Sequence, residues 1–146
     1  LGGADATVGI FALGNASTTR NKYKFSCDTN GAATASTSNS CGTSAAGNST
    51  RGIFALGSSG TTRNKYTYAC DVNGTATASS ASSCYGAATV NSTRGIFALG
   101  YSSGLSATRN KYTYACDTSP VISSGAATVA SFDGSAASNG TCGVNV

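Results

Sequence analysis

The chain has 146 residues and a formal net charge of +4, and it lacks His, Glu, Gln, Met and Trp. Without His, a Ser/His/Asp arrangement cannot form, and paired carboxylates would have to come from five scattered Asp, so we expect no enzyme and no cofactor. No uncharged run is apolar enough over about 20 residues to span a bilayer, so we also expect no membrane span.

One apolar phrase occurs three times, as GIFALG at residues 9–14, 52–57 and 95–100. From Gly9 to Gly52, and again from Gly52 to Gly95, the step is 43 residues. The third unit is longer only in YSSGLSATR, and insertions of this kind fall in loops. The sequence predicts a single repeat domain over 1–146. Its units cover approximately 1–41, 42–84 and 85–130, with 131–146 as a partial fourth unit or an edge strand.

Each unit contains two strands of different character. GIFALG is apolar at four consecutive positions, which is typical of a strand covered on both faces. The following RNKYTYA alternates, with Tyr66 and Tyr68 on one face and Lys65 and Thr67 on the other, so we expect one wet face. Small-residue strands such as YGAATV precede GIFALG. Because strong helix formers other than Ala are scarce, the chain is predicted to be all-β.

The order GIFALG, short turn, TRNKYTYACD, variable stretch and CYGAATVNSTRGIFALG resembles bacterial-type kelch-like repeats. The resemblance extends over nearly the whole chain and implies four-stranded blades of a β-propeller. The doubled Gly and the Trp of kelch repeats are missing here. A β-solenoid is the alternative fold, because it also tolerates small residues and polar stacks.

The six cysteines suggest disulfides, since no CxxC pair and no His offer a zinc site. Cys27 with Cys41 and Cys70 with Cys84 would each close a 15-residue loop, worth about 3 kcal/mol. Cys116 and Cys142 break this pattern, and Cys142 is the strongest candidate for a bridge between chains. Bridges between units are the alternative.

Disulfides imply an oxidising compartment, so we expect an extracellular or cell-surface location. The chain begins at Leu1 without Met, which suggests a processed mature protein or an excised fragment.

Two polar motifs recur in the turns. Asp28, Asp71 and Asp117 each follow a cysteine, and an Asx-type turn explains them better than a calcium loop, since the later ligands are absent; we expect no metal. Candidate glycosylation sites occupy the same place in successive units, before the apolar strand, where a plain polar turn is the alternative. They are Asn48, Asn91 and Asn139.

The RNK triplets place basic residues beside an aromatic, a combination that can bind anionic sugars or nucleic acid. The excess of nine basic over five acidic residues is modest, so we expect no nucleic-acid partner. The favoured interpretation pairs Arg with Asp across a blade while Lys keeps the surface soluble. The candidate surface or ligand residues are Arg20, Lys22, Tyr23, Arg63, Lys65, Tyr66, Arg109, Lys111 and Tyr112.

Together these features predict an extracellular structural or adhesive protein that binds itself, as a dimeric ring or a head-to-tail filament, through open edge strands. The alternative is a lectin-like module that binds carbohydrate through the repeated Tyr, Asn and Arg.

Overall fold

The computed structural model describes the chain in segments. These are residues 2–4, 7–12, 16–57, 60–82, 84–98, 100, 101, 103–121, 136–139 and 141–145. All named strands pair in antiparallel fashion with their neighbours in sequence. No helix long and apolar enough to span a membrane occurs in these segments. The all-β prediction is confirmed.

Each repeat unit forms its own sheet. The first sheet contains β1 (Gly2–Ala4), β2 (Val8–Ala12), β3 (Arg20–Lys24) and β4 (Thr29–Ala33). The second contains β5 (Ser44–Gly47), β6 (Arg51–Ala55), β7 (Arg63–Thr67) and β8 (Val72–Ala76). The third contains β9 (Ala87–Val90), β10 (Arg94–Ala98) and β11 (Arg109–Thr113), and a hairpin of β12 (Ala136–Ser138) and β13 (Gly143–Asn145) follows.

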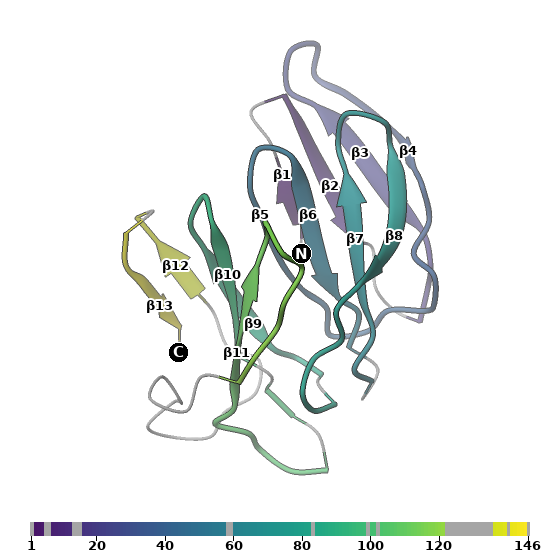
Figure 1. The fold of residues 1–146 in the computed structure, drawn as a ribbon. Coiled ribbons are helices and arrows are strands. Elements are labelled where there is room, and N and C mark those ends of the chain that lie inside the picture. Colours follow the sequence, from purple (N-terminus) through teal and green to yellow (C-terminus); the bar gives the residue numbers. More distant parts are fainter. Residues whose placement is uncertain are drawn as a thin grey trace.

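The sheets are arranged in chain order. Figure 1 shows the first sheet in purple and blue, the second in teal, the third in green and the hairpin in yellow, each beside the next. The four-stranded meander is what a propeller blade requires. The described sheets form an open series, however, and no closed ring is present among them.

Pro120 explains why the third sheet has no continuous fourth strand. The Lys111 amide donates to the Pro120 carbonyl at 3.0 Å, and Asn110 is bridged to Val121. Proline has no N–H to return to Lys111. Residues 118–121 therefore follow β11 only through isolated bridges.

The apolar phrase is the buried centre of the second sheet, as the sequence predicted. Ile53 and Phe54 both have 0% exposure, and they belong to two separate apolar clusters. Ile53 packs with Phe97 of the third sheet, and Phe54 packs with Ile10 of the first. The core therefore lies between the sheets, and each sheet supplies half of it.

The predicted wet face of the RNKYTYA strand is confirmed in part. Tyr66 and Tyr68 are buried toward the first sheet, whereas Lys65 and Thr67 on the other face are only half-buried. Lys65 reaches Asp117 of the third unit, which therefore covers part of that face.

Replacement of Gly95 in β10 by Ala tests this packing. A Cβ at Gly95 would lie 2.7 Å from Cβ of Ala46 in the second sheet and 3.1 Å from the Tyr114 hydroxyl. We expect Gly95→Ala to lower the free energy of unfolding by about 1–3 kcal/mol, because both neighbours are buried and must shift. Urea denaturation would measure the change.

Gly9→Ala is the matched control in β2. Its nearest neighbour outside its own strand is the ring of Phe25, at 3.2 Å, and this exposed ring can move aside. Equal losses for the two variants would contradict packing between the sheets as the cause.

Candidate interface between repeat units

A buried arginine joins each sheet to the next. The Arg20 guanidinium, 1% exposed, lies 4.5 Å above the centre of the Phe54 ring. It donates to Asn73 Oδ1 at 2.6 Å and to Asn64 Oδ1 at 3.1 Å. Stacking on an aromatic face and donation in a planar fork are both properties of Arg that Lys lacks.

The contact repeats one unit later with equivalent residues. Arg63 lies 4.5 Å above the centre of the Phe97 ring and donates to Asn110 Oδ1 at 3.3 Å and to Ser119 Oγ. Burial lowers the pKa of the Arg63 guanidinium to about 10, which leaves it charged at neutral pH. The same interface therefore occurs twice in one chain.

The asparagine that accepts a hydrogen bond from the arginine is held through both its side-chain oxygen and its side-chain nitrogen. The Thr37 amide donates to Asn64 Oδ1 at 3.0 Å, and Asn64 Nδ2 donates to the Thr37 hydroxyl at 2.7 Å. Asn110 makes the matching pair with Ser80, at 3.0 Å and 2.8 Å. These bonds satisfy polar groups that burial would otherwise leave costly.

An ion pair lies two residues beyond the arginine in each of β3 and β7. Lys65 Nζ is 2.8 Å from Asp117 Oδ2, and Lys22 pairs with Asp71 in the same way. The Tyr112 hydroxyl and the Thr77 amide also donate to Asp117, the amide at 3.0 Å. Each Asp therefore collects donors from the preceding unit and from its own strand.

These donors determine the carboxyl pKa. Burial alone would raise the pKa of Asp117, but the hydrogen bonds from Lys65, Tyr112 and the Thr77 amide outweigh it and hold this pKa well below its usual range. Burial opposes a similar lowering at Asp71, where Lys22 and Thr34 are the outside donors. Both carboxylates are therefore charged at neutral pH.

The Asp residues thus differ from the sequence prediction. Their backbones have φ of 55°, 53° and 52° at Asp28, Asp71 and Asp117, a turn conformation that Asp tolerates. The carboxylates of Asp71 and Asp117, however, bind the preceding unit and not a local amide. The pairing is also different from the favoured interpretation, since Lys binds Asp and Arg binds Asn and Phe.

Four of the nine candidate surface residues cannot form a ligand surface. Arg20, Arg63, Tyr66 and Tyr112 have 0–1% exposure, so their assignment as surface residues is wrong: a neighbouring sheet covers them. Tyr23, Lys22, Lys65, Arg109 and Lys111 are partly exposed. Among the described residues, no three His, Cys, Asp or Glu side chains come together as metal ligands.

The contacts of the basic side chains run in one direction along the chain. Arg and Lys of one unit donate to Asn and Asp of the next. The third sheet therefore ends in donors and the first sheet begins with acceptors. We call Phe11, Tyr23, Phe25 and Asp28 the first face, and Arg94, Ile96 and Lys111 the last face.

The first face is open. Phe11 is 46% exposed and Phe25 is 52% exposed, whereas their counterparts Phe54 and Tyr114 are 0% and 2% exposed. Asp28 is also exposed, and it belongs to no ion pair within the described residues. The sequence did not predict this face, because its residues resemble their equivalents in the other units and nothing in the sequence marks them as uncovered.

None of the six cysteines forms a disulfide in this structure, and the pairing stays a prediction. Cys27 lies in the turn after β3, whereas Cys41 is bridged to Gly57 beyond β6, level with the start of β7. Five strand residues, roughly 16 Å, separate the two ends of such a sheet, too far for an S–S bond. Cys70 and Cys84 are separated in the same way. Cys116 and Cys142 are exposed.

Cys41 and Cys84 are instead neighbours in successive units. Cys84 Sγ lies 3.7 Å from the Cys41 carbonyl oxygen, and the Tyr85 amide donates to the Gly42 carbonyl at 3.0 Å. A bond between them would be the bridge between units that the sequence left as an alternative.

The candidate glycosylation sites lie in one repeated turn. In each, the Asn side chain accepts backbone amides two and three residues later: Asn48 at 3.0 and 3.1 Å, Asn91 at 3.0 and 2.9 Å, Asn139 at 3.0 and 2.8 Å. Asn48 Nδ2 also donates to the Ser92 carbonyl at 3.2 Å, so the atom that a glycan would use is already engaged there. Glycosylation stays a prediction.

No family model matches the chain, and no curated protein shows significant sequence similarity to it. The kelch-like resemblance therefore stays a prediction.

Asp117→Asn tests the ion pair between units. It removes a charged acceptor of several hydrogen bonds, so we expect the free energy of unfolding at pH 7 to fall by about 1–3 kcal/mol. Asp28→Asn is the control, because Asp28 lies in the same turn without these donors; its effect should stay within about 0.5 kcal/mol.

The same variants test the pH dependence. A folded pKa below the unfolded value of about 3.9 stabilises the protein above that pH and is lost as pH falls. The gap between wild type and Asp117→Asn should therefore narrow progressively below about pH 4. A gap that persists unchanged at lower pH would contradict this account.

Oxidation should join Cys41 to Cys84. Glutathione disulfide would convert these two thiols into one disulfide and be reduced to two molecules of glutathione. Non-reducing peptide mapping would identify the bridge, and Cys84→Ser should abolish it. Maps that join Cys27 to Cys41, or Cys70 to Cys84, would overturn the expectation.

Proposed function

We propose that the protein is an extracellular structural repeat protein that assembles with further copies of itself, head to tail, through its end sheets. One observation carries the proposal. The two interfaces inside the chain use the same kinds of contact, and the first face has the acceptor side of such an interface while the last face has the donor side. Self-association would extend an interface that the fold already makes twice.

The end sheets are favoured over the edge strands that the sequence suggested. Within the chain, backbone pairing joins strands of one unit, whereas units join mainly through side chains between sheet faces. A second copy that follows the same rule would meet a face. An extracellular location rests on the six cysteines, of which Cys41 and Cys84 are neighbours in successive units.

The lectin alternative has lost its main support. The residues that would read a sugar at equivalent sites in each unit, Tyr66, Tyr112, Asn64 and Asn110, are all buried between sheets. Their hydrogen bonds are made within the protein.

The purified full chain should associate without added ligand. We expect sedimentation velocity to show a mass that grows with protein concentration, and electron microscopy to separate rings from filaments. Phe11→Ser should weaken the association by about tenfold or more, because exposed aromatic residues at an interface centre contribute strongly.

Val72→Ser in β8 is the control, since Val72 is 52% exposed but belongs to the second sheet, whose faces are covered. It should leave the association unchanged. A protein that stays monomeric at every concentration would overturn the proposed function.

A further inference from the structure

The hairpin β12–β13 repeats the beginning of a unit. Its turn uses Asn139 as the earlier units use Asn48 and Asn91, and the Asn139 amide donates to the Cys142 carbonyl at 3.2 Å, where Asn91 donates to Arg94 at 2.9 Å. The strand registers also agree, since Ala136 pairs with Asn145 as Ala88 pairs with Phe97. The hairpin is therefore a copy of the first two strands of a unit.

The hairpin lies on the third sheet in the place of a following unit. The Thr89 hydroxyl donates to the Ala137 carbonyl at 3.0 Å, and the Ser138 hydroxyl donates to the Val90 carbonyl at 2.7 Å. Both bonds join β12 to β9, as β9 packs on β5 in the preceding interface. The hairpin thus covers the part of the third sheet that strands β1 and β2 of a second copy would have to contact.

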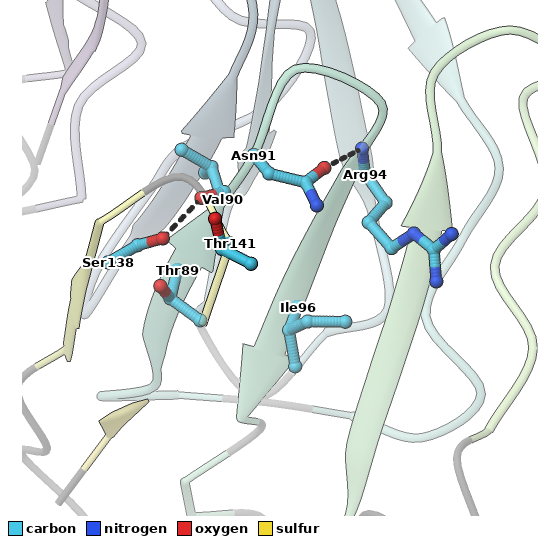
Figure 2. A pocket seen from close by; sticks show the side chains of 7 residues that line it. All are labelled: Thr89, Val90, Asn91, Arg94, Ile96, Ser138 and Thr141. Carbon is cyan, nitrogen blue, oxygen red and sulfur yellow. Dashed lines mark hydrogen bonds between the residues drawn. The ribbon is translucent and has the colours of Figure 1, made fainter. Parts of the chain in front are cut away.

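The hairpin leaves part of the last face uncovered. A pocket of about 160 Å³ opens between it and β10, lined by residues that include Arg94 and Ile96. Figure 2 shows Ser138 and Thr141 of the hairpin on one side of this pocket and Arg94 on the other.

Comparison with the preceding interface shows what is missing there. Ile53 is fully buried in a cluster with Tyr112 and Tyr114, whereas its counterpart Ile96 is only half-buried. Arg51 donates to the Tyr114 carbonyl at 3.0 Å, whereas its counterpart Arg94 is exposed.

The ion pair is missing as well. Lys65 binds Asp117, but within the described residues Lys111 has no carboxylate partner. Among the described residues, the last face therefore lacks the aromatic pair, the backbone acceptor and the anion of the preceding interface.

The first face of a second copy would supply these groups. Tyr23 and Phe25 stand at the positions of Tyr112 and Tyr114, and Asp28 stands at that of Asp117. Phe11 pairs with Gly2 at the register position where Asn145 pairs with Ala136 in the hairpin, so a second copy has Phe where the hairpin has Asn. The complement in charge is also present, with Asp28 on one face and Arg94 and Lys111 on the other.

We propose that the first sheet of a second copy binds the third sheet as a fourth unit and displaces the hairpin β12–β13, which acts as an internal competitor for that site. This inference rests on the proposed self-assembly and specifies its surface and its regulation. In the assembled state Asp28 of one copy pairs with Lys111 of the other.

A charge exchange in the full chain tests the pairing. Asp28→Lys and Lys111→Asp should each weaken the association by about tenfold or more, because each places like charges opposite one another. The double variant restores an opposite pair in reversed order, and its dissociation constant should return to within about threefold of wild type. Lys24→Asp, which changes the net charge as Lys111→Asp does, should have no such effect.

Hairpin variants test the competition by sedimentation at matched concentrations. Ser138→Ala removes a hydrogen bond that holds the hairpin, so the second copy should bind about two- to tenfold more tightly. Asn145→Phe gives the hairpin the aromatic residue that a complete unit has at this position. A hairpin that competes more strongly should weaken binding of the second copy. Circular dichroism would confirm that each variant remains folded.

The outcomes separate this inference from the proposed function. Association that the charge variants leave unchanged would overturn the surface named here while the self-assembly itself stands. Weakened single variants without rescue in the double variant, or hairpin variants without effect, would also overturn the inference. A wild-type chain that never associates would overturn both.

Discussion

A buried arginine between successive sheets is the interaction on which the stacking depends. Arg63 lies above the Phe97 ring and donates to Asn110 and Ser119, so one neighbouring unit holds both the face and the two terminal nitrogens of its guanidinium, while Nε has no hydrogen-bond partner among the described residues. A guanidinium costs much free energy to bury unless its donors are satisfied and its face is stacked. The arginine therefore favours one relative position of the two sheets, because sliding one sheet along the other would break these contacts at a cost in free energy. Lys65 and Asp117 fix the same offset two residues further along the strand.

This arrangement explains how a chain poor in large apolar residues forms a core. Each sheet contributes single apolar side chains to either face, such as Ile53 on one and Phe54 on the other, and the cluster is completed only by the neighbour. A unit alone would expose both. Stability in such a protein comes from nearest-neighbour interfaces, as in other repeat architectures. Small residues such as Gly95 let the sheets approach closely enough for those interfaces to form.

The strands could be predicted from the sequence, and their partners could not. Apolar continuity in GIFALG indicated a strand covered on both faces, and this holds for Ile53 and Phe54. A period of two shows which residues share a face but not what covers it, so Lys65 was assigned to solvent. Asp71 lies in the predicted turn, yet its carboxylate binds Lys22, 49 residues earlier. Cys27 and Cys41 have the same spacing in sequence as Cys70 and Cys84, which suggested a closed loop in each unit. In the structure the length of a strand separates the two cysteines.

The direction of the contacts restricts the kinds of assembly that this fold can make. Each interface has a donor side and an acceptor side, and the two are different surfaces of one unit. A two-fold dimer that joined first face to first face would bring Asp28 against Asp28 and leave Lys111 without the anion that Lys65 has. Only a heterologous contact satisfies both sides, and such a contact leads to a ring if the rotation closes and to a filament if it does not. The offset fixed by Arg20 and Arg63 inside the chain sets that rotation, because the contact between copies would repeat the same geometry. In the proposed assembly, the hairpin β12–β13 governs how readily the series grows, since each added copy must first remove it from the third sheet.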